Sequence, residues 1–320
     1  MYKCDFCNFY SEDLEDFEVD YQFHKGYWCP WCDGFTYFKE ARSNSHHFSV
    51  IFEKKALINS ENPIKVNFHT HTSPLRWPGG KSKFIGPILS RCRSENMVNF
   101  VEPFAGGASV GLSLLLAGKI EELFLNDLDY GVYSLFQVIK DCPWMLIDKI
   151  EKFVPSKEAY KKAQKMLKNK YKELDMLEAA WNLLIVNRLA FSGIAKANCM
   201  SNPAARWNAD TLKRRIMNIH SHSKHLHVSC MDACDFIEEM YWKPNTTLFI
   251  DPPYKSAGEK LYMEYYKEDD HERLAFLLDE LYKGMPGADM LLTYDDSDFI
   301  KSLYRFPIIE EIGRIYSISN

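Results

Sequence analysis

The sequence predicts an α/β fold built around a Rossmann-like parallel sheet. An apolar run at 98–101 is followed by a glycine-rich turn and by an apolar helix that ends near Gly118. About twenty residues after the glycines, a second apolar run delivers an acid, Asp127. A third run, 246–250, has the character of a buried strand and delivers the segment 251–254. Strands that alternate with helices in this way favour a parallel sheet.

Composition fits a globular protein with one large domain and a small appendage. Of 320 residues, 46% are hydrophobic and 26% are charged, which excludes a wholly disordered chain. There is no run of eighteen apolar residues and no signal-peptide pattern, so membrane and secreted classes are not expected. The nine cysteines are unevenly spread, and a chain of this size does not need disulfides. We therefore expect a reducing, cytoplasmic compartment.

Two Cys-x-x-Cys pairs lie at the amino terminus and predict a zinc ribbon over residues 1–45. Each pair places two thiolates on one tight turn, and two turns complete a tetrahedral structural zinc site. A redox pair and a catalytic zinc with His24 are the weaker alternatives. Residues 46–73 are expected to be a linker with short strands at 48–52 and 64–68. The four predicted zinc ligands are Cys4, Cys7, Cys29 and Cys32.

The segment that begins the main domain suggests close contact with an anionic ligand. It reads Trp77-Pro78-Gly79-Gly80-Lys81, in which the glycines allow the backbone to approach a ligand. It is not a P-loop, because Leu75 occupies the position where that motif requires glycine. The turn at 102–109 and the acid Asp127 together indicate a nucleotide-like ligand whose ribose hydroxyls bind the carboxylate.

The net charge of −5 conceals a strongly basic segment. Residues 140–230 carry 17 Lys and Arg against 8 Asp and Glu, whereas residues 231–320 carry 9 against 19. The stretch 156–181 has helical composition and is rich in lysine. A solvated helix face is the ordinary explanation, but a basic insert in an acidic chain also suits the phosphates of nucleic acid. The histidines at 220–227 lack the spacing of a metal site.

The segment Asp251-Pro252-Pro253-Tyr254 has a chemistry of its own. Two consecutive prolines remove two backbone N–H donors, so that carbonyl oxygens lie beside a carboxylate and an aromatic ring. This combination suits a planar amine that donates two hydrogens while its ring stacks on the tyrosine.

The motifs and their order resemble those of Dam-type (D12 class, alpha group) adenine-specific DNA methyltransferases. The resemblance runs from about Pro74 to the end of the sequence, on segments 77–81, 102–107, 126–127, 187–193, 251–254 and 314–319. It implies a Rossmann-like methyltransferase domain at 74–139 and 231–320, with a helical DNA target-recognition insertion at 140–230. Ser192 stands where the family commonly has Asn, and members usually continue past the final Ser-Ile-Ser stretch with another strand.

The resemblance also implies roles for individual residues. The residues that correspond to S-adenosylmethionine contacts are Trp77, Lys81, Phe104, Gly106, Asp127, Asp235, Phe236 and Asp251. Asp232 competes with Asp235 for the adenine end of the cofactor. The expected catalytic residues are Asp251, Pro252, Pro253 and Tyr254, and the expected DNA contacts are Asn187, Arg188, Lys196, Arg206, Arg214 and Arg215.

The expected reaction is methyl transfer to the N6 amine of an adenine flipped out of duplex DNA. A catalytically silent DNA-binding module of the same fold, or a methyltransferase for cytosine or RNA, remains the alternative. A monomer or weak dimer is expected, with a restriction nuclease or another protein as a possible partner.

Overall fold

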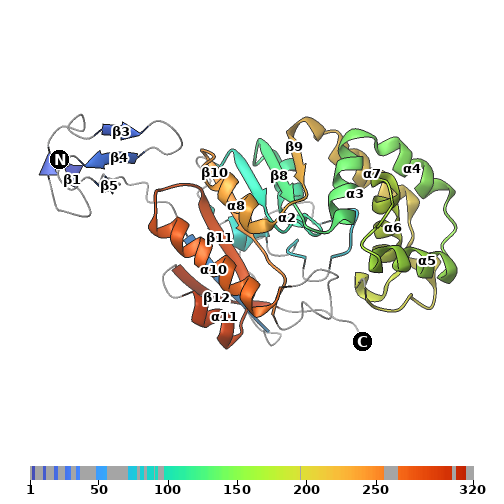
Figure 1. Ribbon diagram of the computed structural model, residues 1–320. Coiled ribbons are helices and arrows are strands. Elements are labelled where there is room, and N and C mark those ends of the chain that lie inside the picture. The colour runs from blue at the N-terminus through green and yellow to red at the C-terminus, as the bar shows by residue number, and fades with distance from the viewer. Residues whose placement is uncertain are drawn as a thin grey trace.

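The structure is a computed structural model (Figure 1). It describes residues 2–3, 10–11, 18–20, 26–29, 34–36, 48–55, 71–77, 80–82, 85–89, 91–92, 97–194, 196–255, 266–304 and 308–314.

The amino-terminal region contains short antiparallel strands. One pair consists of β1 (Tyr2–Lys3) and β2 (Tyr10–Ser11). A three-stranded sheet consists of β3 (Glu18–Asp20), β4 (Gly26–Cys29) and β5 (Gly34–Thr36). Of the four predicted zinc ligands, only Cys29, at the end of β4, has a described backbone, and Cys4, Cys7 and Cys32 lie outside the described residues. The zinc site therefore stays a prediction.

The main domain is built on a seven-stranded sheet whose neighbouring strands are all parallel, which confirms the predicted α/β class. The spatial order is β12-β6-β11-β10-β7-β8-β9. The strands are β6 (Phe48–Lys55), β7 (Asn99–Glu102), β8 (Glu122–Asn126), β9 (Leu226–Ser229), β10 (Thr246–Ile250), β11 (Asp289–Asp295) and β12 (Ile308–Arg314).

Strand β6 was expected in a linker, but it lies inside the sheet between β11 and β12. The predicted strand at 64–68 lies outside the described residues. Strand β9 occupies residues that the predicted boundary gives to the insertion, yet it pairs with β8 at the opposite edge of the sheet.

Helices cover both faces of the sheet. Successive side chains of each strand point to opposite faces, so each strand contributes to two hydrophobic clusters. Phe249 and Leu291 belong to one hydrophobic cluster, whereas their neighbours Leu248 and Met290 belong to the other. The first cluster includes α2 (Ser109–Leu116), α3 (Tyr130–Asp141), α6 (Met176–Leu189) and α7 (Ala209–His220). The second includes α8 (Ala233–Tyr241), α10 (Glu268–Lys283) and α11 (Asp298–Leu303).

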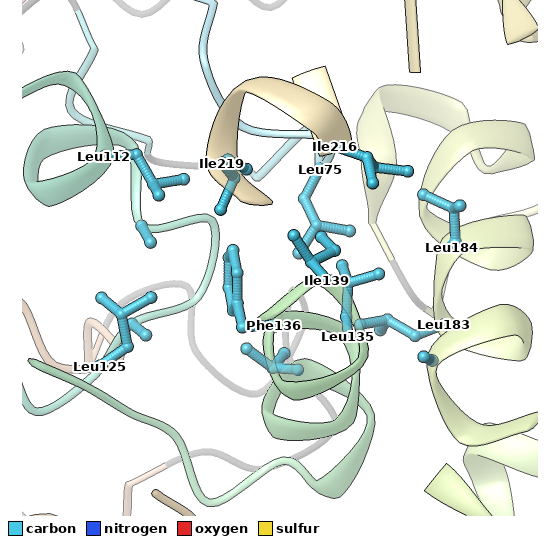
Figure 2. Close-up of a cluster of buried hydrophobic side chains, with 14 of the residues drawn as sticks. Leu75, Leu112, Leu125, Leu135, Phe136, Ile139, Leu183, Leu184, Ile216 and Ile219 are labelled. Atoms are coloured by element: carbon cyan, nitrogen blue, oxygen red, sulfur yellow. The ribbon is translucent and has the colours of Figure 1, made fainter. Parts of the chain in front are cut away.

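The helices of residues 140–220 share a core with the sheet. Figure 2 shows Leu112 of α2, Ile139 of α3, Leu183 of α6 and Ile216 of α7 in one buried cluster. Helix α3 packs against both α6 and α7. The basic segment is therefore a direct extension of the hydrophobic core that covers the sheet. The remaining helices are α1 (Ile85–Leu89), α4 (Pro143–Lys152), α5 (Lys157–Lys168), η2 (Phe191–Gly193), η3 (Pro203–Arg206) and η4 (Ser223–His225).

The stretch 156–181 is two helices rather than one. Helix α5 ends at Lys168, and Lys170, Tyr171 and Glu173 then adopt positive φ angles that no helix contains. The side chain of Asp175 accepts a hydrogen bond from the Glu178 N–H and begins α6.

Candidate functional site

A cavity of about 310 Å³ opens at the carboxyl ends of the central strands. Its volume falls within the range of about 300–1,000 Å³ usual for small-molecule sites. The chain leaves β7 toward β8 and β9, but β10 and β11 lie on the other side of β7. Such a reversal of strand order leaves a crevice where ligands of α/β sheets bind. The segments that follow β7, β8 and β10 all line the cavity.

Asp251 follows β10 and is the centre of the polar wall. Its carboxylate oxygens lie 2.7 and 2.6 Å from Nζ of Lys81, and the Thr293 hydroxyl donates to Oδ1 at 2.7 Å. Lys81 is 3% exposed, whereas Asp251 is 22% exposed and faces the cavity. A carboxylate has about four acceptor positions. Asp251 therefore keeps acceptor capacity for a ligand beside its internal partners.

The glycine turn and Trp77 form one wall together. Gly106 has a φ of 46°, and a Cβ at this position would come within 2.6 Å of Nε1 of Trp77. Only glycine meets both demands without strain. The Gly106 N–H donates to Oδ2 of Asp127 at 2.8 Å, and the Asp129 N–H donates to Oδ1 at 2.9 Å. Both oxygens of Asp127 are thus held in place, and the residue lines the cavity.

A second buried acid, Glu102, fixes the start of the helix that follows the glycine turn. Its Oε1 accepts the N–H of Gly111 in the first turns of α2. Burial raises the pKa of Glu102 to about 8, although that hydrogen bond opposes the rise. Burial likewise raises the pKa of Asp127, and the neighbouring charge of Asp129 adds to the effect.

Aromatic rings provide the apolar part of the cavity. Tyr254 lies with its ring 4.9 Å from Nζ of Lys81 and 6.2 Å from the ring of Tyr294. Phe104 meets Tyr266 edge to face at 5.4 Å. Phe104, Tyr254 and Tyr266 line the cavity, so a planar ring can enter beside Asp251.

The segment that begins α8 differs from the prediction. Phe236 is buried in the hydrophobic core, and Asp235, which is paired with Arg273, is not among the cavity-lining residues. The cavity is lined instead by Asp232, Ala233 and Cys234. Asp232 caps α8 by accepting the N–H groups of Cys234 and Asp235, which brings this turn to the cavity. Of the two acids predicted for this role, Asp232 thus lies at the cavity and Asp235 does not.

The predicted DNA-contact residues lie at different depths. Lys196, Arg206 and Arg214 are exposed, whereas Arg188 is 8% exposed. Asn187 is buried, and its amide is bound to the main chain of Arg76: it accepts from the Arg76 N–H at 2.7 Å and donates to the Arg76 carbonyl at 3.1 Å. Asn187 also lines the cavity. It therefore joins α6 to the segment that carries Trp77.

Sequence reasoning assigned no role to several residues that shape the site. Thr293 reaches Asp251 from β11, and its position near the end of an apolar run was the available signal. Asn126 is fully buried, accepts the Met231 N–H and donates to the Pro103 carbonyl. It thus holds the ends of the β7 and β8 segments at the α8 turn. Arg76 had no distinguishing pattern.

Comparison with protein families gives a match over most of the chain. The model of the D12 class N6 adenine-specific DNA methyltransferase family matches residues 77–318. This span includes all the cavity-lining residues named above.

Two curated proteins are similar to the chain. The type II methyltransferase M.MjaIII of Methanocaldococcus jannaschii is 23% identical over 254 residues, which is 72% of this chain and 86% of that protein. The type II methyltransferase M.CviBI of Paramecium bursaria Chlorella virus NC1A is 24% identical over 254 residues, 76% of this chain and 90% of that protein. Among the described residues, no helix combines the length and the apolar character needed to cross a membrane.

Proposed function

This chain belongs to the D12 class of N6 adenine-specific DNA methyltransferases, and we propose that its cavity holds S-adenosylmethionine and a flipped-out adenine side by side. The observation that carries the proposal is the position of Asp251, which lies in the cavity with acceptor capacity to spare between the glycine turn and the ring of Tyr254. The order of the motifs supports the Dam-type alpha group.

The cofactor half of the site is formed by the glycine turn and its neighbours. The contacts are made by Trp77, Phe104, Gly106, Asp127 and Asp232, with Lys81 acting through Asp251. The fit rests on the cradle at Gly106, which a Cβ would fill, and on the fixed carboxylate of Asp127, which accepts ribose hydroxyls. When bound, S-adenosylmethionine supplies a methyl group on a positively charged sulfur.

The acceptor half activates the adenine amine. The lone pair of that nitrogen is delocalised into the ring, which makes it a weak nucleophile. Asp251 and the carbonyl of Pro252 accept its two hydrogens, so that the lone pair becomes available, while Tyr254 holds the ring by stacking. Pro253 fixes the backbone between them. Positioning and electrostatics supply most of the acceleration, and the product ammonium loses its proton without a strong base.

The substrate is a base within duplex DNA, which reaches such a cavity only after it has been flipped out. Arg188, Lys196, Arg206, Arg214 and Arg215 bind the DNA, and residues 140–225 supply most of this surface. Asn187 contributes from the cavity wall. The lysines of α5 add phosphate contacts.

One experiment tests the reaction against its alternatives. The full chain is incubated with methyl-labelled S-adenosylmethionine and, in separate samples, with mixed-sequence DNA or with RNA, and each nucleic acid is digested to nucleosides. Label in N6-methyl-2′-deoxyadenosine from the DNA supports the proposal. Label in methylcytosine or only in RNA overturns the adenine assignment, and no label in any product favours a silent DNA-binding module.

A place in a type II restriction-modification system is part of the proposal, since both relatives carry the name type II methyltransferase. A cognate nuclease would then cut the unmethylated site. Sequencing of modified bases in DNA from cells that express the protein gives the site. Methylation without any preferred sequence contradicts this role.

A structural zinc bound by Cys4, Cys7, Cys29 and Cys32 is also proposed, on the spacing of the two cysteine pairs alone. Metal analysis of the purified full chain should find one zinc, and Cys7→Ser should lose it. Zinc content that Cys7→Ser leaves unchanged contradicts the assignment. Cys92, Cys142, Cys199, Cys230 and Cys234 are free thiols, and a reducing, cytoplasmic compartment remains our proposal.

A further inference from the structure

Four arginines from separate segments gather beside the cavity. Arg76 precedes Trp77, Arg188 lies in the last turn of α6, Arg206 ends η3, and Arg215 lies in α7. Internal contacts hold them: Arg188 Nη2 donates to the Arg206 carbonyl at 3.0 Å, and Arg215 Nη1 donates to the Ser73 carbonyl at 2.8 Å. Asn187 fixes the main chain of Arg76. We refer to these four residues as the arginine cluster.

The arginine cluster is not neutralised by any acid among the residues that the structure describes. Within the described ranges, none of the four guanidinium groups pairs with a carboxylate. Burial, together with the charges of Arg76, Arg215 and Arg206, lowers the pKa of Arg188 to about 10. Burial and the charge of Arg206 also lower the pKa of Arg76. Like charges therefore repel one another here in a partly desolvated place.

Two buried nitrogen atoms in the cluster have no hydrogen-bond partner among the described residues. They are Nη1 of Arg76 and Nε of Arg188, and Arg188 is 8% exposed. A buried donor without a partner costs free energy, and a charged donor costs more. One bound anion with several acceptor oxygens would reduce the repulsion between the arginines and would accept hydrogen bonds from the two unpaired nitrogen atoms.

We propose that the arginine cluster binds one phosphodiester group of the DNA strand, next to the nucleotide that enters the cavity. This inference rests on the proposed function and adds to it a specific phosphate site that includes Arg76. A phosphate offers acceptor oxygens in the geometry that arginine forks match, and its charge offsets the repulsion within the cluster.

The position of the cluster indicates which phosphate it holds. Gly193 and Asn187 line the cavity, and a Cβ on Gly193 would come within 2.1 Å of the Arg76 carbonyl oxygen. Trp77, the residue after Arg76, also lines the cavity. The cluster is therefore in contact with the cavity wall, so that a strand whose base lies in the cavity passes its backbone beside it.

The test compares the salt dependence of DNA binding in matched variants. Arg188→Gln removes the most buried member, and Arg206→Gln removes an exposed one whose side chain is not part of the core. Lys119→Gln is the control, since it removes an exposed cation between the carboxyl end of α2 and the amino end of β8, whereas the cavity lies at the carboxyl ends of the strands. Affinity for a labelled DNA duplex is measured over a series of salt concentrations.

Each cluster variant should bind about tenfold more weakly in low salt, and the slope of log affinity against log salt should fall by about 1, as for one lost phosphate contact. Lys119→Gln should keep the wild-type affinity and slope. Binding of S-adenosylhomocysteine at wild-type affinity shows that each variant is folded.

Two results would overturn the phosphate site. If folded Arg188→Gln and Arg206→Gln keep the wild-type slope and affinity, the cluster does not bind DNA. If they bind more weakly with an unchanged slope, the arginines read base edges instead of a phosphate. Failure of the proposed function is separate, because wild-type protein would then transfer no methyl group to adenine, whatever the slopes.

Discussion

The cavity and the arginine cluster both hold cations away from water, but they balance the charge in different ways. Lys81 in the cavity wall is paired with both oxygens of Asp251. Arg188 in the cluster donates to the Arg206 carbonyl, lies near the charges of other arginines and has no carboxylate partner in the described part of the chain. A paired charge is neutralised before any ligand arrives, whereas an unpaired cluster becomes favourable only when an external anion binds. The cavity is thus organised in advance, and the cluster depends on its substrate.

The largest effect is expected from Asp251→Asn, which keeps the size of the side chain and removes its charge. Methyl transfer should fall at least about 100-fold, because the adenine amine loses its charged acceptor. DNA affinity should be unchanged, since the arginine cluster is intact. Rates of label transfer and DNA titrations measure the two effects. Asp148→Ala, at an exposed acid of α4, serves as the control, and transfer at the wild-type rate by Asp251→Asn would exclude the catalytic role.

The second effect concerns stability. Lys81→Met leaves Asp251 without its cation, and we expect the free energy of unfolding to fall by about 2 kcal/mol, since Asp251 is partly exposed. The double variant Lys81→Met/Asp251→Asn should lose less than the sum of the two single variants, because the pair is removed as a unit. Urea denaturation measures all four proteins. Strict additivity would mean that the two charges do not interact.

Glu102 adds a third way of burying an ionisable group, beside the paired Lys81 and the arginine cluster. It is a buried acid, and it makes the free energy of unfolding depend on pH. The pKa of Glu102 is about 8 in the folded protein, against 4.5 when exposed. Between these values the folded chain holds a proton that the unfolded chain has released, so the free energy of unfolding should fall as pH rises and level off above about 8.

The matching variant is Glu102→Gln, whose amide oxygen can still accept the N–H of Gly111. It should show a flatter stability profile from pH 5 to pH 8, as followed by urea denaturation at each pH. A wild-type profile in the variant would assign the dependence to other groups.

The smallest effect is expected at an exposed ion pair. Arg273 contacts Asp232 and Asp235, but it is 54% exposed. Arg273→Gln should change the free energy of unfolding by less than about 0.5 kcal/mol, since solvent and salt screen such pairs. Thermal or urea unfolding in low and high salt measures it. A loss as large as that of Lys81→Met would remove the distinction between buried and exposed pairs.

The core of the fold and of the site could be predicted because its signals are local. The strand predicted at 246–250 is confirmed as β10, since a run buried on both faces is apolar throughout. The helix predicted to end near Gly118 is confirmed as α2. Asp127 and Asp251 are 124 positions apart in the numbering, yet both line the cavity, because the carboxyl ends of parallel strands meet at one edge.

The features that were missed depend on pairings between distant residues. The role that we propose for Arg76 depends on its position near Arg188, and no local sequence pattern around either residue predicts that they lie close together. Asp235 and Phe236, which were predicted at the cofactor, are not among the cavity-lining residues, because the cap of α8 at Asp232 decides which residues face the cavity. The break after α5 depends on three residues with left-handed backbone conformation, and none of them is glycine. The composition of this stretch therefore does not predict where the helix ends.

The position of β6 has a consequence for the newly made chain. This strand leaves the ribosome before every other strand of the sheet, but both of its neighbours, β11 and β12, follow β7 to β10 in the chain. Strands β7, β8 and β9 can pair while synthesis continues, whereas β6 keeps two open edges until β11 and β12 have been made. A translation product that stops before β11 would therefore present an unpaired apolar strand to chaperones and proteases. The sheet thus closes only when β11 and β12 pair on either side of β6.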